Sequence, residues 1–364
     1  MTLHLYFAKR FTLLFLAVLA VFGVFQYLID LIEELRRADA DAGFALVAQI
    51  TAFKLPSGIY QIMPLVMILS TIALFLGMAR SSELVVARAA GRSGLAVLAA
   101  PVLVAAIIGG LSLAMLNPIV AATGQRYSDL REAARGNEAS VVSVGRDGLW
   151  LRQGSASGQA VIRASRASPD ATQLYDVSIL TYAAGGGPQN RILAETARLV
   201  DGAWVLTNAQ VWPLTPGLNP ELGTKRHSEL RVASTLTGDS IRDRFGAPSD
   251  VAIWDLPRFI ADLEAAGFSA RRHIVWLQME MARPLFLVSM MLLGAAFTMR
   301  PQRSGRTGLA VLASLLLGFG LYYVNNFAQI LGEGGQIAPW LAAWVPPVAS
   351  LMIALGIVLH MEDG

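Results

Sequence analysis

Six long apolar runs limit the folds open to this chain more than any other feature. A helix needs about 20 mostly apolar residues to cross roughly 30 Å of hydrocarbon, and each run meets that length. Only 15% of the 364 residues are charged and 54% are hydrophobic, a balance unusual for a soluble protein of this length. The sequence therefore predicts an α-helical membrane protein with six transmembrane helices. The runs cover approximately residues 11–32, 56–79, 94–117, 274–299, 308–331 and 339–360.

A long polar segment between the third and fourth runs has the pattern of short β-strands. Its two Asp-Gly pairs predict tight hairpins, because both central residues of such turns need positive φ. In "LYDVSIL", Tyr175, Val177 and Ile179 alternate with polar residues, the period of a half-buried strand. These signals predict an inserted all-β domain of the sandwich or jelly-roll type, followed by an amphipathic helix in "DLPRFIADLEAAG". We expect domains at 1–122 (transmembrane helices 1–3), 123–270 (β domain and amphipathic helix) and 271–364 (transmembrane helices 4–6).

Basic residues in the short loops predict the orientation, because Lys and Arg are retained on the cytoplasmic side of a membrane. The N-terminus and the loops after the second and fourth runs are basic, whereas the loop after the first run balances basic with acidic residues. Both termini are therefore expected in the cytoplasm and the β domain on the opposite side. The basic residues are Lys9, Arg10, Arg80, Arg88, Arg92, Arg300, Arg303 and Arg306.

The sequence has no recognisable catalytic or nucleotide-binding motif. Its three lysines, Lys9, Lys54 and Lys225, lie outside any G-x-x-x-x-G-K-[ST] spacing. If this membrane protein is an ATP-driven transporter, another chain must therefore hydrolyse the ATP. No G-x-S-x-G or H-E-x-x-H pattern is present, and there is no cysteine to form a disulfide in an exported domain. We expect neither an enzyme nor a bound metal or cofactor.

Glu280 and Arg283 are the clear charged residues within a transmembrane run. They are three residues apart and therefore share a helix face. One interpretation is a self-neutralising pair that faces the helix bundle next to a kink at Pro284. The other is a role in handling substrate or protons, because secondary transporters usually carry acidic residues in their spans.

The stretch "RSSELVVARAAGRS" after the second run predicts a short helix. Ser81 or Ser82 is suited to cap its N-terminus, where the helix dipole favours Glu83, and Gly91 is placed to end it. One interpretation is a basic turn that joins two spans on the cytoplasmic side. The sharper interpretation is a coupling helix near 81–91 that seats in a groove of a separate ATPase. Its contact residues would be Arg80, Glu83, Leu84 and Arg88.

With these motifs the sequence resembles the lipopolysaccharide export permeases of the LptF/LptG (YjgP/YjgQ) family. The resemblance covers essentially the whole chain, including the order of three helices, one domain and three helices. Its most specific part is "SELVVARAAG", supported in the right order by "GLWLR", "LVDGAWVLTNA", "RPLFLVSMMLLGAAF" and "GFGLYYVNN". The end of the first run, "LIDLIEELRRA", is similar to the acidic and then basic segment of the LptG branch.

The resemblance implies a half-transporter that pairs with a paralogous, LptF-like permease subunit around a lipid-sized cavity. A cytoplasmic, LptB-like ABC ATPase dimer would use ATP and Mg²⁺ beneath it, and this chain would bind no cofactor. Lipopolysaccharide would pass from the bacterial inner membrane into the β-jelly roll and on to periplasmic bridge and single-span subunits (LptC/LptA-like). The first and fifth helices would form lateral gates, and Glu83 would be the acid of the coupling helix.

Cations at the outer end of the first helix suit such a substrate, because lipid A carries phosphates that arginine binds in a bidentate manner. The resemblance places the family's phosphate-contacting pair on Arg36 and Arg37. Further candidates for phosphate binding are Lys54 and Arg126, and Arg131 and Arg135 would continue the same basic rim.

Two other functions are compatible with the sequence. One is a membrane-anchored envelope assembly or structural protein without transport, which would not need a capped cytoplasmic helix. The other is a secondary transporter that uses Glu280, which would work without ATP.

Overall fold

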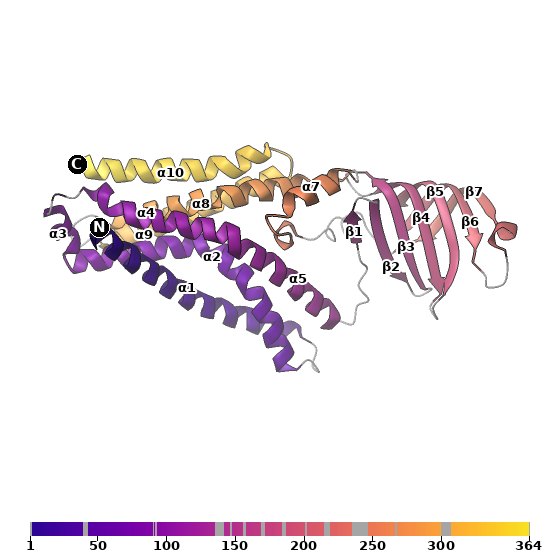
Figure 1. Ribbon diagram of the computed structural model, residues 1–364, viewed down its shortest axis with the longest axis horizontal. Helices are drawn as coiled ribbons and strands as arrows, with labels where there is room; N and C mark the ends of the chain where they lie inside the picture. The colour runs from indigo at the N-terminus through magenta and orange to yellow at the C-terminus, as the bar shows by residue number, and fades with distance from the viewer. Residues whose placement is uncertain are drawn as a thin grey trace. The chain divides into compact units, whose positions relative to one another are not determined.

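The computed structural model of the chain forms two compact units. The first comprises Met1–Leu130, Ala252–Trp254 and Ile274–Gly364, and the second comprises Arg131–Val251 and Asp255–His273. The first unit holds the long apolar helices and the second a β-sheet (Figure 1). The structure describes residues 2–38, 43–89, 91, 93–134, 142–145, 148–155, 158–168, 172–183, 187–200, 202–214, 219–234, 247–265, 268–299 and 307–363.

The six predicted transmembrane helices are confirmed, since six helices in the described part of the chain are long and apolar enough to cross a membrane. Several extend beyond the predicted limits, because a nucleated helix continues through flanking residues of good helix propensity. The third span contains a π-helical turn. The bounds are α1 (Thr2–Arg37), α2 (Phe44–Arg80), the third span of α4 (Gly94–Leu111), η1 (Ser112–Leu116) and α5 (Asn117–Ala134), then α8 (Arg271–Thr298), α9 (Thr307–Glu333) and α10 (Pro339–Asp363).

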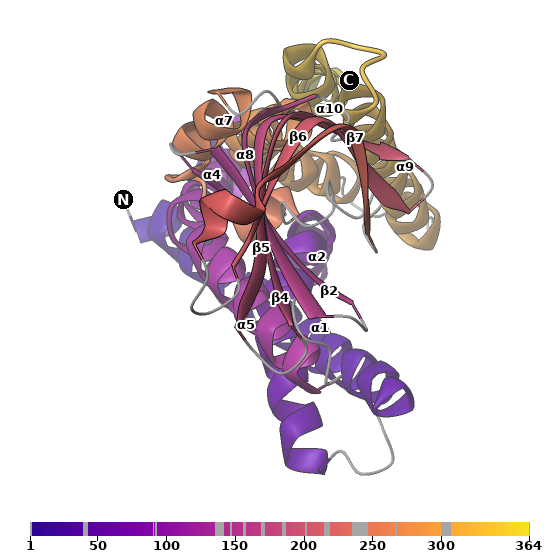
Figure 2. The ribbon, with the colours of Figure 1, turned by 90° about the vertical axis from the view of Figure 1, so that its right-hand side faces the viewer.

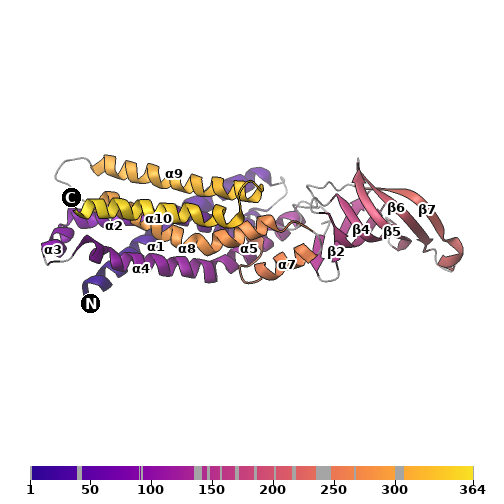
Figure 3. The same ribbon diagram turned by 90° about the horizontal axis from the view of Figure 1, so that it is seen from above.

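The core of the helical unit lies around α2 and α8, with α1 and α4 packed against them. Phe7, Phe11 and Phe15 are four residues apart, so they project from one face of α1, and all three are buried. Other faces of α1 and much of α9 expose large apolar side chains, as helices that face lipid or other helices do. Helix α9 lies beside α10 (Figure 3).

The first and the last helix of the chain meet at one end of the helical unit. Helix α1 begins there, α10 ends there, and the short helix α3 (Glu83–Ala89) lies at the same end (Figures 1 and 3). The predicted short helix between the second and third spans is thus present. Residues Glu83–Ala89 therefore lie at the end of the helical unit where α1 begins.

The described residues of the second unit form one antiparallel sheet in which each strand pairs with the next along the chain. The inserted all-β domain is confirmed, but its connectivity differs from the predicted sandwich or jelly roll, which would have Greek-key connections between two sheets. Turn residues between successive strands favour hairpins instead, and the strands fan out through their twist (Figure 2). The strands are β1 (Val142–Gly145), β2 (Gly148–Ser155), β3 (Gly158–Ala167), β4 (Gln173–Ala183), β5 (Pro188–Val200), β6 (Ala203–Pro213) and β7 (Lys225–Ala233).

Both predicted Asp-Gly hairpins are confirmed by the strand register. Gly145 pairs with Gly148 across the first turn, and Val200 pairs with Ala203 across the second. Gly202 has a φ of 72°, which glycine adopts without strain. The aspartates of both turns lie outside the described residues.

Polar side chains of β3 to β6 form hydrogen bonds in two pairs, and one residue of each pair has a positive φ. Asp176 and Asn208 have positive φ values of 52° and 51°. The Ser165 hydroxyl donates to Asp176 at 2.8 Å, and the Asn208 amide donates to the Glu195 carboxylate at 2.8 Å. These bonds join neighbouring strands at the positions where the backbone changes direction.

The bend corrects the predicted alternation in β4. Val177 and Ile179 are buried as predicted, but Tyr175 is only half-buried and Leu174 is buried in its place. The positive φ at Asp176 turns the backbone, so the side chains before it point to the opposite faces from those that a regular strand would give.

The predicted amphipathic helix is confirmed as α7 (Leu256–Ala265). Leu256 and Leu263 are buried, and Phe259 and Ile260 between them are half-buried, so the predicted apolar stripe faces the protein. Gly267, expected to end this helix, lies outside the described residues. Two short 3-10 helices, η2 (Pro220–Gly223) and η3 (Pro248–Asp250), complete the second unit.

Candidate functional site

The short helix α3 is bounded by residues with left-handed backbone conformations. Ser82, immediately before it, has a φ of 57°, and Gly91, after it, has a φ of 75°. The Ser82 carbonyl accepts hydrogen bonds from the backbone N–H groups of Val85 and Val86. Ser81 was a candidate to cap the N-terminus of α3, but its hydroxyl lies 3.0 Å from the Gly77 carbonyl of α2.

Glu83, at the start of α3, is bonded to α1 of the same chain. The Arg10 guanidinium donates to both carboxylate oxygens, at 2.7 and 2.6 Å. The Tyr6 hydroxyl lies 3.2 Å from the carboxylate, and the Ser81 hydroxyl lies 2.7 Å from it. This group of four residues, which we call the α1–α3 clasp, fastens the short helix to the first span. Sequence reasoning assigned Arg10 only to the orientation of the chain.

The clasp keeps Glu83 ionised. Partial burial alone would raise the pKa of its carboxyl, but hydrogen bonds from Ser81 and Arg10 and the charge of Arg10 lower the pKa below its ordinary value. A carboxyl with a lowered pKa stabilises the fold above its ordinary pKa of about 4.3, and that contribution is lost only as the pH falls through the lowered value. The bond to Arg10 is therefore fully present at neutral pH.

The other residues in and next to α3 that could contact a partner differ in exposure. Leu84 is buried and belongs to the core of the helical unit. Val85 and Val86 are 58% and 67% exposed, so they are the apolar residues that α3 presents outward. Arg80 is also exposed. The side chain of Arg88 lies outside the described residues.

The basic residues predicted at the ends of α1 and α2 are largely paired with acids. Arg37 donates to Glu33 one turn earlier on α1. Lys54 of α2 donates to Asp30 at 2.7 Å and lies 3.6 Å from Glu33. Arg36 is exposed and has no ion pair among the described residues. Arg36 is therefore the cation of this group that is open to an anionic ligand.

Helix α5 reaches the same region of α1. The Tyr127 hydroxyl donates to Glu34 at 2.6 Å and so joins the two helix ends. Arg126, the next residue along the chain, is exposed. Arg131 follows on α5, and Arg135 lies outside the described residues.

Glu280 and Arg283 form a buried ion pair on α8, as one of the two sequence interpretations holds. The guanidinium donates through Nη2 to Glu280 at 2.7 Å and through Nε at 3.1 Å. The Tyr60 hydroxyl of α2 also donates to Glu280, and the Asn117 amide of α5 lies 3.3 Å from it. Asn117 in turn accepts the Ile253 N–H at 2.9 Å. The pair is thus a junction of three spans.

A proline on α2 and another on α8 shape the contacts around this junction. Pro64 has no N–H, so the Tyr60 carbonyl of α2 lacks its usual helical partner. Arg283 donates to that carbonyl at 3.3 Å, and its guanidinium lies 3.9 Å from the centre of the Tyr60 ring. On the facing side, Pro284 packs so closely on Gly109 of α4 that an added Cβ would lie 2.7 Å from the proline Cα.

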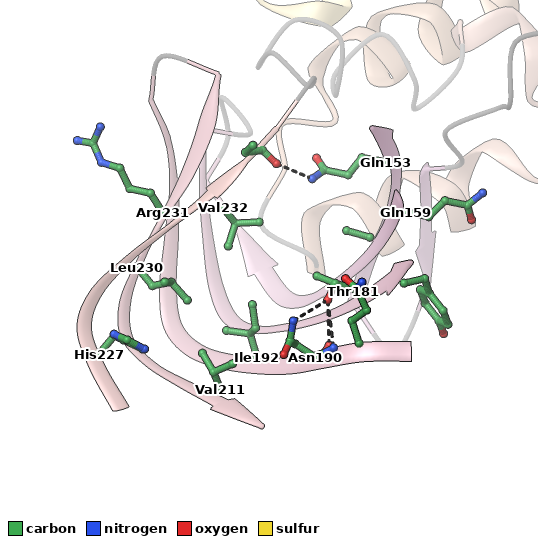
Figure 4. A pocket seen from close by; sticks show the side chains of 14 residues that line it. Gln153, Gln159, Thr181, Asn190, Ile192, Val211, His227, Leu230, Arg231 and Val232 are labelled. Carbon is green, nitrogen blue, oxygen red and sulfur yellow. Dashed lines mark hydrogen bonds between the residues drawn. The ribbon is translucent and has the colours of Figure 1, made fainter. Parts of the chain in front are cut away.

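The β-sheet curls into a trough with a cavity of about 390 Å³ (Figure 4). Ile192, Val211 and Val232 project into it. Its polar patch is Thr181 and Asn190, which bond to each other across β4 and β5. Gln153 of β2 donates to the carbonyl of residue 233 at 3.0 Å, so it links two strands that are not neighbours in the sheet.

In chain order, three membrane-spanning helices, an antiparallel β domain and three further membrane-spanning helices, with a short clasped helix after the second span, define a multi-pass membrane protein among the described residues. The model of the lipopolysaccharide export system permeases LptF/LptG matches residues 5–360, and the chain belongs to that family.

Two relatives illustrate the similarity. The chain is 25% identical to the lipopolysaccharide export system permease protein LptG of Escherichia coli (strain K12) over 341 residues. The matched region covers 92% of this chain and 91% of that protein. It is 25% identical over 295 residues to LptG of Haemophilus influenzae, covering 78% of this chain and 76% of that protein. The resemblance found in the sequence is therefore confirmed, and both relatives are of the LptG type.

Proposed function

We propose that this chain is a permease subunit of an ABC-type lipopolysaccharide exporter in the bacterial inner membrane. It extracts the lipid from the membrane and passes it to a periplasmic bridge, while a separate ATPase hydrolyses ATP with Mg²⁺. The family match over residues 5–360 carries this proposal. The partners expected are a paralogous permease subunit, a cytoplasmic ATPase dimer, and the bridge and single-span subunits.

The geometry of α3 supports a coupling role. Its outer face presents Val85 and Val86, while Leu84 anchors it in the bundle. A partner that docks on the valines meets Glu83 at the start of the helix, where the carboxylate is 30% exposed beside Arg10. Movement of the docked helix would pass to α1 through the clasp, because the two are joined by short charged hydrogen bonds.

Orientation and lipid binding complete the proposal. The end of the bundle with α3 faces the cytoplasm and the β domain faces the periplasm, as the distribution of basic loops predicts. The opposite ends of α1 and α2 then lie near the outer headgroups, where Arg36 is the open cation for a lipid A phosphate. Arg37 and Lys54 hold the surrounding acids and shape the same region.

A secondary transporter that uses Glu280 receives less support. The carboxylate is fully buried, and Arg283, Tyr60 and Asn117 already satisfy it. A structural anchor does not account for the exposed valines of α3.

The proposal is tested by purifying the tagged chain from its native membrane in mild detergent. We expect a paralogue of similar size and a P-loop ATPase to come with it. Recovery of the wild-type chain alone, or with assembly factors only, would favour the anchor.

Variants of the clasp then test the coupling role. Glu83→Arg should abolish recovery of the ATPase, because it places a cation against Arg10 and removes the exposed carboxylate at the start of α3. Arg10→Gln should retain the ATPase, since it leaves the carboxylate in place. Equal loss in both variants would mean that Glu83 only fastens α3 to α1. Recovery of an intact complex with Glu83→Arg would refute the coupling assignment.

A further inference from the structure

A second cavity lies inside the helical unit, between α2, α8, α9 and α10. Its volume of about 400 Å³ falls within the range of roughly 300–1,000 Å³ that is usual for small-molecule sites. Glu280 and Arg283 form part of its wall. The cavity is distinct from the trough of the β domain and from the cations at the end of α1.

Arg283 has donor capacity left for a ligand. A guanidinium carries five N–H groups. The described bonds use three of them, through Nε and Nη2 to Glu280 and through Nη1 to the Tyr60 carbonyl. Two N–H groups remain on a side chain that lines the cavity.

Trp276 supplies a further donor. Its indole N–H is buried and has no hydrogen-bond partner among the described residues, and the side chain lines the same cavity. Buried donors are nearly always paired, so this N–H is available to an acceptor that enters the cavity. Trp344 of α10 shows the contrast, because its N–H donates to Gln278 at 2.9 Å.

The other walls combine amides with apolar surface. Asn325 and Asn326 of α9 lie on one side, and Met279, Phe286 and Pro347 provide apolar contacts. The buried pair is neutral as a whole, so an anion bound here would leave an uncompensated charge in a low-dielectric interior. The donors therefore select an uncharged acceptor.

We infer that this cavity binds the uncharged polar region of a lipid: the ester or amide carbonyls and the hydroxyls at the top of the acyl chains. Trp276 and Arg283 donate to the carbonyls, the asparagine amides bond to hydroxyls, and the apolar wall receives the first methylenes. Lipid is the occupant that we infer, because the cavity lies among membrane-spanning helices and α9, which lines it, has large exposed apolar side chains. The site goes beyond the proposed function, since a resident phospholipid and a transported lipopolysaccharide both carry these groups.

Photo-crosslinking of the full chain, purified with its native partners and placed in lipid nanodiscs, tests the inference. One probe is phosphatidylethanolamine with a diazirine close to its ester, and the other is lipopolysaccharide with a diazirine on an amide-linked chain. Labelled peptides are identified by mass spectrometry. We expect labelling within α8 and α9 by at least one probe.

The Trp276→Phe variant removes the donor and keeps an aromatic ring. It should lower that labelling about three- to tenfold, the range expected for loss of one hydrogen bond. The matched control Trp344→Phe, whose indole bonds within the protein, should retain it. Thermal unfolding of both variants verifies that they are folded.

Each outcome decides the matter. Trp276-dependent labelling by phosphatidylethanolamine identifies a resident lipid, and by lipopolysaccharide a transported one; either supports the site. No labelling of α8 or α9, or equal labelling in both variants, overturns it. The phospholipid probe needs no export activity, so failure of the proposed function would leave this result readable on its own.

Discussion

Arg36 and Arg37 are equivalent in the sequence but differ in their surroundings. Arg37 is bonded to Glu33, whereas Arg36 is exposed without an ion pair among the described residues. We expect Arg36→Gln to reduce photo-crosslinking of lipopolysaccharide to α1 by at least about threefold, because it removes a charged hydrogen bond to phosphate. Arg37→Gln is the matched control and should change it little. Equal losses would show that both arginines contact the lipid.

The buried pair on α8 makes a second prediction at the residue scale. Arg283→Met leaves the Glu280 carboxylate buried without its cation, which should destabilise the protein by about 3–5 kcal/mol. The double variant Glu280→Gln with Arg283→Met carries no buried charge and should recover most of that loss. Thermal unfolding in detergent measures both. A double variant as unstable as the single one would contradict the explanation by charge.

Packing between helices is tested by two neighbouring glycines of α4. A Cβ at Gly109 would lie 2.7 Å from the Cα of Pro284, whereas a Cβ at Gly110 would meet nothing within 4 Å in the described structure. Gly109→Ala should therefore force α4 and α8 apart and destabilise the protein by about 1–3 kcal/mol. Gly110→Ala should be neutral or slightly stabilising, because alanine favours helix. A shift of both unfolding temperatures by the same amount would exclude the close contact as the cause.

Elements were predictable from the sequence where their cause is local. The apolar runs predicted six helices because crossing a membrane demands a fixed length, and the Asp-Gly pairs predicted two hairpins because tight turns demand positive φ. The inner face of β4 was not predictable at Tyr175, since it depends on the backbone at Asp176. The bond of Arg10 to Glu83 joins residues 73 positions apart, so no local sequence pattern predicts it.

For the whole molecule, the orientation is the prediction that most needs a direct test. The sequence contains no cysteine, so a single introduced thiol gives an unambiguous label. In intact spheroplasts, a membrane-impermeant maleimide should label Glu221→Cys in the β domain and leave Lys9→Cys, near the start of α1, unlabelled. Permeabilised cells should label both, because both positions are exposed. The reverse pattern would invert the proposed topology.

The order of the strands also has a consequence for synthesis. Each strand of the sheet pairs with the one made just before it, so no strand has to wait for a distant partner. Sheets built from contacts that are local in sequence fold faster than those that join remote segments. The β domain can therefore assemble strand by strand as the chain emerges, and its pairing can be complete before α8 leaves the ribosome. Strands inside the sheet are then unpaired only briefly, so that only the outer edges of β1 and β7 stay open among the described strands, which limits aggregation while the second set of helices is still being made.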